Sequence, residues 1–440
     1  MMTEEKRNPS SRVPWERAGM TQEEWKQSIR FDETDWGWIV MSVGMAIGSG
    51  IVFLPIQIGV TGLLIFLLSA LIGYPVMYAF QRLYINTLAA SPKNQVYAET
   101  ISGYLGKNWG FLMGICYFIM LVDTIITYST VVNNDSATFL YSFGVTSTNL
   151  AGNHLYTFVL MAILIFIASR GEKILFKLQT FMALVILAAL ILMGIRFVPE
   201  WNLSNIAPLP DAWTTIKQVI IMLPFTLTSI LFIQSLSPMV ISYRKHYPNQ
   251  EVARYKAMRT MNIAFVILFV IVFFFAVSFN LGTSREMALL AKEQNISALA
   301  MAAGNMNAAT VKILSLLLSL FAILTSFFSN FLGFCESIKG ILLNILHRFM
   351  NADRIKGATL DKGIVLFSLI FCWACAAFNL PVLLLLAFLG PCIGIIGCLV
   401  PTVLVYQVPY LHQYKGPVLW AIVLTGFLLI VSPFLNVLEG

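Results

Sequence analysis

The chain has 440 residues, of which 58% are hydrophobic and 11% are charged, and its formal net charge is +7 at pH 7. Soluble domains carry roughly 25% charged residues, so this composition excludes an ordinary soluble enzyme and predicts an all-α polytopic membrane protein. The basic residues do not gather on one module, as nucleic-acid binding would require. We expect the positive charge to face anionic membrane lipid.

Residues 1–35 are polar and lack an apolar h-region, so we expect a cytoplasmic N-terminal tail rather than a cleaved signal peptide. On one side of the predicted membrane lie all Lys and Arg except Arg196, Lys217, Arg285, Lys292 and Lys312. The positive-inside rule then places the N-terminus in the cytoplasm and the C-terminus on the opposite side. The eleven apolar stretches that predict this topology lie near residues 36–58, 63–84, 109–133, 154–170, 174–196, 214–243, 259–281, 311–337, 363–380, 383–406 and 417–437.

Two of these spans, the first and the sixth, are interrupted. The first contains Gly48-Ser49-Gly50, and the sixth contains residues 223–229, LPFTLTS. Unwound backbone at this depth is tolerated only where it lines a cavity or is buried in protein. Breaks five spans apart predict a five-plus-five inverted repeat of residues 36–196 and 214–406, with 417–437 as an additional span. The alternative is that these Gly and Pro residues only allow close helix packing.

The break in the first span suits both charges of a zwitterion. The half-helix that begins near Ser49 and Gly50 points N–H groups and the positive end of its dipole at the cavity, which favours a carboxylate. The half-helix that ends near Ile47 exposes carbonyl groups, and those around Phe225 and Thr226 suit an ammonium group or a sodium ion. An amino acid would satisfy both ends.

Span 8 places Thr325 and Ser329 on one helical face, where their oxygens suit a hard cation or a substrate hydroxyl. Alternatively, they bond to carbonyls of their own helix or hold neighbouring helices together. Asp123 is the only acid well inside a predicted span, and such a carboxylate marks a proton site or a pathway by default. Its alternative partners are hydroxyls on its own helix. Lys177 is a second proton-coupling candidate, although it can also snorkel to the surface.

Other features predict no chemistry of their own. The six cysteines all fall inside predicted spans, where they pack as small apolar residues, and Cys372 and Cys375 have no neighbouring His to support redox or metal chemistry. No nucleophile–base spacing or metal signature indicates an enzyme, and no cofactor is expected. Residues 282–310 form the longest outside loop, which is either a hinged lid with two short helices or a loose surface loop.

Several motifs resemble the hydroxy and aromatic amino acid permeases of bacteria, and they look most like the serine and threonine branch of that family. The resemblance covers nearly the whole chain. The matching segments are residues 44–55 (GMAIGSGIVFLP), 72–75 (IGYP), 169–173 (SRGEK), 223–230 (LPFTLTSI), 235–244 (SLSPMVISYR) and 431–435 (VSPFL).

The resemblance implies the amino acid–polyamine–organocation (LeuT-like) fold in the bacterial inner membrane, with a periplasmic C-terminus. It also implies import of L- or D-serine, or of threonine, by proton symport, with sodium coupling left open and no obligate protein partner. By matching motif, residues 47–50 would hold the substrate carboxylate and residues 225–228 its ammonium group. Thr226, Thr228 and Ser229 would face either the side chain or only the backbone of the substrate.

Three alternatives remain beside the serine transporter. The first is an aromatic amino acid permease of the same fold, in which the hydroxyls of Thr226, Thr228 and Ser229 would contact only the backbone of the substrate and not its side chain. A permease-like nutrient sensor differs in having no measurable uptake. A channel is disfavoured, because the spans show no continuous polar lining or charged ring.

Overall fold

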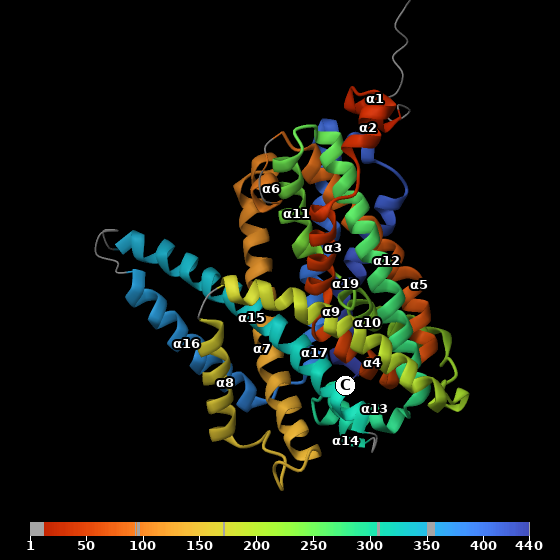
Figure 1. Cartoon of the computed structure of the whole chain (residues 1–440), viewed down its shortest axis with the longest axis vertical. Coiled ribbons are helices and arrows are strands. Elements are labelled where there is room, and N and C mark those ends of the chain that lie inside the picture. Colours follow the sequence, from red (N-terminus) through yellow and green to blue (C-terminus); the bar gives the residue numbers. More distant parts are fainter. Residues whose placement is uncertain are drawn as a thin grey trace, which may run out of the picture.

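The computed structural model describes residues 13–92, 94, 97–169, 172–305, 309–349 and 357–439. Within these ranges every regular element is a helix (Figure 1). The first part of the chain forms α1 (Pro14–Ala18), α2 (Gln22–Ser28), α3 (Glu33–Ala46), α4 (Ser49–Thr61), α5 (Leu63–Ala90), α6 (Tyr97–Leu105), α7 (Lys107–Ser142), α8 (His154–Ala168), α9 (Glu172–Phe197) and α10 (Ala212–Thr228). The second part forms α11 (Ile233–His246), α12 (Gln250–Gly282), α13 (Arg285–Glu293), α14 (Ala298–Asn305), α15 (Ala309–Phe349), α16 (Gly357–Phe378), α17 (Val382–Ile393), α18 (Val400–Gln407) and α19 (Val418–Glu439). A π-helical segment, Gly394–Leu399, joins α17 to α18.

The helices have the length and composition of a multi-pass membrane protein. Among the described residues, nine helical segments are long and apolar enough to cross a bilayer, and α3 with α4 makes a tenth as a bent pair. The helix α8, with 15 residues, is apolar but shorter than the others. Ten spans therefore meet the length criterion within the described ranges, and α8 occupies the position of the remaining predicted span.

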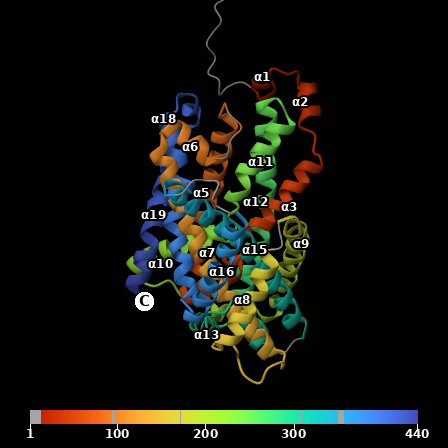
Figure 2. The same cartoon turned by 90° about the vertical axis from the view of Figure 1, so that its left-hand side faces the viewer.

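The bundle has two distinct ends. The helices α1 and α2 lie at one end, which we call the N-terminal end, and α13 and α14 lie at the other (Figure 1). A view turned by 90° shows α6 and α18 near the N-terminal end as well (Figure 2). We call α13 and α14, residues 285–305, the lid segment. Residues 297–303 are buried, so this part of the predicted outer loop packs into the bundle and is not a loose surface loop.

The predicted break in the first span is confirmed. The helices α3 and α4 meet at an angle of 45°. Ile47 and Gly48, which lie between them, have extended backbone, with φ of −78° and −161°. The start of α3 is set by Asp32, whose side chain accepts hydrogen bonds from the N–H groups of Thr34 and Asp35. The sequence therefore encodes both the beginning of this helix and its early end.

In the sixth span the break begins only at the last residue of the predicted segment 223–229, because residues 229–232 are non-helical. The helix α10 continues through Pro224 to Thr228, and regular structure resumes at Ile233 in α11. The hydroxyls expected to accompany unwound backbone instead support the helix, because Thr226 donates to the Met222 carbonyl (3.1 Å) and Thr228 to the Pro224 carbonyl (2.7 Å). Such back-bonding lets a helix continue past a proline.

The helix α7 is longer than the predicted span of residues 109–133. Its 36 residues end at Ser142 and carry Asp135 in a buried position. The expectation that Asp123 is the only acid inside a span is therefore wrong. The polar run of residues 133–136 extends past the predicted end of the span. Its side chains find partners in Ala151, Tyr156 of α8, Asn379 and Ser319 of α15.

Candidate functional site

A cavity of about 160 Å³ lies at the break in the first span. It extends from the break toward the N-terminal end, because Val40 and Met41 of α3 and Gln234 of α11 line it. The volume is large enough for about ten water-sized molecules, and so for a small polar solute. The polar side chains on its wall are Thr124, Tyr128, Thr228, Gln234, Thr325, Ser326 and Asn330.

Two glycines let the broken ends approach their neighbours. A Cβ atom at Gly50 would lie 2.5 Å from the Thr228 carbonyl oxygen, so the start of α4 touches the end of α10. A Cβ atom at Gly48 would overlap the Tyr128 hydroxyl and lie 2.9 Å from Ser326 Oγ. The two breaks, 178 positions apart in the chain, therefore meet at one place and open into one cavity.

The helix α15 supplies a hydrogen-bonded wall facing the break. Ser326 Oγ donates to the Ile47 carbonyl at 3.1 Å. One turn further along α15, Asn330 Nδ2 donates to the Ser326 carbonyl at 2.8 Å, and Thr124 Oγ1 donates to Asn330 Oδ1 at 3.0 Å. The sequence predicted Thr325 and Ser329 on this helix, and the structure adds the neighbouring positions Ser326 and Asn330 to Thr325 on the cavity wall. The spacing of Ser326 and Asn330, four residues apart, is the signal that could have found this wall.

The predicted residues of the sixth span divide into two groups. Thr228 lines the cavity. Thr226 and Ser229 are buried and face α5, where Thr226 Oγ1 lies 3.0 Å from Ser69 Oγ and Ser229 Oγ lies 3.2 Å from the Tyr74 hydroxyl. Phe225 is also buried, and its carbonyl accepts the Ser229 N–H at 3.1 Å. Of this group, the structure brings only Thr228 to the cavity.

The remaining predicted residues are placed as follows. Thr325 lines the cavity, and its hydroxyl donates to the Phe321 carbonyl of its own helix at 2.8 Å. Asp123 does not line the cavity, and its Oδ2 is buried without a hydrogen-bond partner among the described residues. The side chains of Ser49, Lys177 and Ser329 lie outside the described residues.

Asp135, which the sequence prediction missed, fixes the lid segment to the bundle. Its Oδ1 accepts the Ser297 backbone N–H at 2.9 Å, and its Oδ2 accepts the hydroxyls of Ser297 and Ser319. Ser297 immediately precedes α14, so the carboxylate satisfies an N–H group at the start of that helix. Next to it, Asn134 Nδ2 donates to Asn379 Oδ1 at 2.8 Å. We call Asp135, Ser297 and Ser319 the lid-end cluster.

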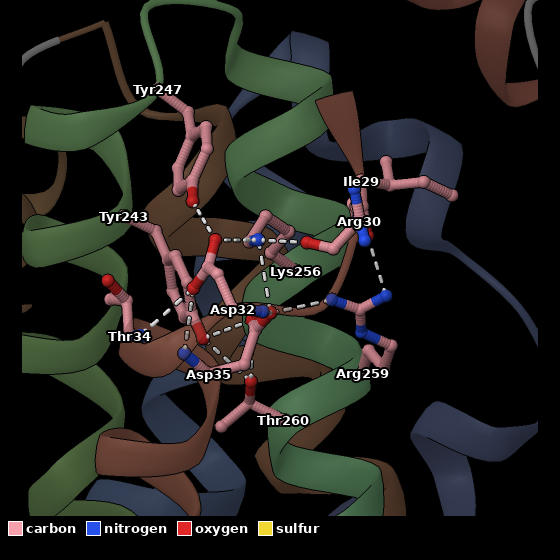
Figure 3. A network of polar contacts seen from close by, with 10 residues as sticks. All are labelled: Ile29, Arg30, Asp32, Thr34, Asp35, Tyr243, Tyr247, Lys256, Arg259 and Thr260. Atoms are coloured by element: carbon pink, nitrogen blue, oxygen red, sulfur yellow. Dashed lines mark hydrogen bonds and ion pairs between the residues drawn. The ribbon is translucent and has the colours of Figure 1, made fainter. Parts of the chain in front are cut away.

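A cluster of charged residues holds the N-terminal end (Figure 3). Lys256 Nζ lies 2.6 Å from Asp32 Oδ2 and 3.0 Å from Asp35 Oδ2, and Arg259 Nη2 lies 2.7 Å from Asp35 Oδ2. The side chains of Asp35 and Lys256 are fully buried. We call these four residues the N-terminal-end cluster.

Two further contacts join the N-terminal-end cluster to α11. The Tyr243 hydroxyl donates to Asp35 Oδ1 at 2.7 Å, and the Tyr247 hydroxyl donates to Asp32. Burial by itself would raise the pKa of Asp32, but hydrogen bonds from Lys256 and Tyr247 lower it from 3.8 to about 2. The cluster therefore ties the first half of the broken span, α3, to α11 and α12.

Nothing in the described part of the chain indicates a metal centre. Among those residues no group of three or more His, Cys, Asp or Glu side chains could hold a metal ion. What the site offers is a small polar cavity between two helix breaks inside a multi-pass membrane bundle. These features define a membrane transporter for a small solute.

Comparison with known proteins identifies the family. Residues 33–438 match the tryptophan/tyrosine permease family, and the chain belongs to it. The chain is 53% identical to a serine transporter of Escherichia coli O157:H7, with 96% of each chain covered. It is 25% identical to the serine transporter SdaC of Escherichia coli strain K12, covering 87% of this chain and 90% of that one. The protein is therefore an amino acid permease.

The fold also resembles that of a solved transporter. A manganese transporter of Eremococcus coleocola superposes with a TM-score of 0.52 at 16% identity, covering 100% of this chain and 90% of that one. At this identity the likeness concerns the fold alone. It agrees with the all-helical architecture of the bundle.

Proposed function

We propose that this permease imports serine across the bacterial inner membrane by proton symport with alternating access. The observation that carries the proposal is the meeting of the two helix breaks, Gly50 of α4 against the Thr228 carbonyl of α10, beside a cavity of about 160 Å³. Serine transporters among the relatives support the substrate. The small cavity favours serine or threonine over an aromatic amino acid.

The substrate's charges match the two helix ends. Its carboxylate would bind the N–H groups of the first turn of α4, at Gly48, Ser49 and Gly50, where the helix dipole is positive. Its ammonium group would bind the carbonyls that remain at the breaks, foremost that of Thr228, since the Phe225 carbonyl already accepts a backbone N–H. Both contacts use backbone atoms, so they would hold any α-amino acid and leave selectivity to the side chains around them.

The direction of opening follows from the positive-inside rule. If the N-terminal end faces the cytoplasm, the cavity lies on the cytoplasmic side of the break and the lid segment on the periplasmic side. In alternating access, this structure would then be an inward-facing state with the lid segment closed. The two breaks would occupy corresponding places in a five-plus-five inverted repeat.

The coupled proton needs a titratable group within the membrane. Asp123 remains our candidate because its Oδ2 is buried without a partner among the described residues, one position before Thr124 on the cavity wall. Lys177 is the second candidate. A membrane potential supplies about 2.3 kcal/mol per charge per 100 mV, which is sufficient to accumulate an amino acid.

Uptake into proteoliposomes tests the proposal. We would follow labelled L-serine and D-serine under an imposed proton gradient and then a sodium gradient, with excess threonine or tryptophan as competitor. Proton-dependent serine uptake blocked by threonine is the expected result. Serine uptake driven only by sodium would reject proton symport, and tryptophan uptake without serine uptake would move the substrate to the aromatic amino acids.

A further inference from the structure

The cavity wall carries a side-chain amide with spare hydrogen-bonding capacity. A carboxamide offers two N–H donors and an oxygen with two lone pairs. In Asn330, one N–H serves the Ser326 carbonyl at 2.8 Å, and Oδ1 accepts from Thr124 Oγ1 at 3.0 Å. Among the described contacts, one donor and one lone pair of this amide therefore remain for a ligand in the cavity that Asn330 lines.

The Thr124 hydroxyl orients this amide without using up its oxygen. It donates to one lone pair of Asn330 Oδ1 at 3.0 Å, with the Met120 carbonyl as a second acceptor at 2.7 Å, so the other Oδ1 lone pair stays available to a ligand. A hydroxyl group needs both a donor and an acceptor opposite it, and Asn330 offers both from one rigid plane. An amino acid that lacks the hydroxyl would leave these groups without a partner in a largely dehydrated site, which costs binding free energy.

The position of Asn330 along α15 suits a short side chain. Ser326 donates to the Ile47 carbonyl at the break, and Asn330 lies four residues further along α15, a rise of about 6 Å toward the N-terminal end. A substrate whose charged groups lie at the break and whose side chain points along the cavity would therefore place a β-hydroxyl beside Asn330.

A second amide, that of Gln234 in α11, also lines the cavity. Gln234 is an exposed residue, and no described side chain holds its amide. Binding a ligand there would freeze several rotatable bonds, whereas Asn330 is already held on both sides. The pre-organised amide of Asn330 is therefore the better hydrogen-bonding partner for a substrate hydroxyl.

We propose that Asn330, positioned by Thr124, binds the side-chain hydroxyl of the substrate and makes the cavity selective for serine and threonine over alanine. This inference rests on the proposed function, because it assumes that the cavity holds a small amino acid. It assigns the recognition of the hydroxyl to α15 and α7, whereas the sequence had pointed to the threonines and serine of span 6.

The test measures equilibrium binding of L-serine and L-alanine to the purified full-length protein, so that it does not depend on transport. We expect the wild-type protein to prefer serine by roughly 10- to 100-fold. Asn330→Ala should bring this ratio close to one by weakening serine binding, with alanine affinity changed by less than about threefold. Gln234→Ala removes the competing amide from the same cavity; a change in its overall affinities is compatible with the proposal, but the ratio of serine to alanine binding should stay at the wild-type value.

The outcomes separate this inference from the proposed function. A wild-type ratio in Asn330→Ala, or a collapsed ratio in Gln234→Ala alone, would overturn the role of Asn330. If Asn330→Ala does not fold, Thr124→Val decides, since it removes the positioning hydroxyl at nearly constant volume and should lower the ratio in the same direction. Wild-type protein that binds alanine and serine equally also refutes the inference, whereas wild-type protein that binds neither refutes the proposed function itself.

Discussion

At the N-terminal end of the bundle the carboxylates of Asp32 and Asp35 meet the cations of Lys256 and Arg259, whereas at the lid end the carboxylate of Asp135 is held by serine hydroxyls and a backbone N–H. The first cluster balances two negative charges with two positive charges. The second, within the described contacts, satisfies its charge by hydrogen bonds alone.

This difference predicts different costs of separation. Pulling apart buried ion pairs leaves uncompensated charges, which is strongly destabilising, whereas a carboxylate that leaves neutral donors can exchange them for water. We therefore expect α3 to stay attached to α11 and α12, and the lid segment to be the part that opens more readily.

The largest expected effect is that of removing the buried cation at the N-terminal end. Lys256→Met leaves Asp32 and Asp35 without their shared partner and should lower the free energy of unfolding by about 3–5 kcal/mol. Thermal unfolding in detergent would measure the change. The matched control is Lys339→Met, which removes the exposed partner of Asp361 (side chains 41% and 52% exposed) and should cost less than about 1 kcal/mol. Equal effects of the two variants would mean that the buried cluster does not clamp this end.

Forcing the start of α4 away from the end of α10 should weaken substrate binding. Gly50→Ala places a methyl group 2.5 Å from the Thr228 carbonyl oxygen, so either α4 or α10 must move. We expect serine affinity to fall roughly 10-fold or more, as overpacking of this kind usually costs 1–3 kcal/mol. Binding measurements on Gly37→Ala provide the control, because a Cβ atom there meets nothing within 4 Å. Unchanged affinity in Gly50→Ala would argue against a substrate site between the breaks.

Disturbing the lid-end cluster should destabilise the lid segment and leave the rest of the bundle unchanged. Asp135→Asn replaces one carboxylate oxygen by an NH₂ group and disturbs the contacts of Ser297 and Ser319. The backbone amides of α14 should then exchange with solvent roughly 10-fold faster or more, with little change elsewhere. Ser136→Ala is the control, because the Ser136 hydroxyl bonds Tyr156 of α8 and not the lid segment. Exchange that rises throughout the bundle would contradict a local role.

The smallest expected effect is a pH dependence of the N-terminal-end cluster. The pKa of Asp32 is lowered from 3.8 to about 2, so its ionised form stabilises the folded protein at all pH values above the unfolded-state pKa. This contribution should be complete above about pH 4 and lost as the pH falls toward 2. The difference in unfolding temperature between the wild-type protein and Asp32→Asn should therefore be constant from pH 7 to about pH 4 and shrink below it. If the difference in unfolding temperature already disappears near neutral pH, a group other than Asp32 is responsible for the titration.

Much of the fold could be predicted from local sequence. Apolar stretches of bilayer length predicted the spans, and Gly48 and Gly50 predicted the break in the first one, because glycine in the middle of a long helix is costly unless a close approach requires it. The two short helices of the lid segment were one of the two alternatives predicted for residues 282–310. These features are determined by residues that are close together in the chain, so they can be predicted from the sequence.

The direction of the polar side chains could not be predicted in the same way. Thr226 and Thr228 differ by two positions, and only packing against α5 decides that the first is buried beside Ser69 while the second lines the cavity. Asp135 lies two residues beyond the predicted end of the third span, and its donors, Ser297 and Ser319, are more than 160 positions away in the chain. Sequence by itself determined the membrane spans, the first break and the family. The tertiary structure alone decided which hydroxyls and acids meet, because those contacts join helices that are far apart in the chain.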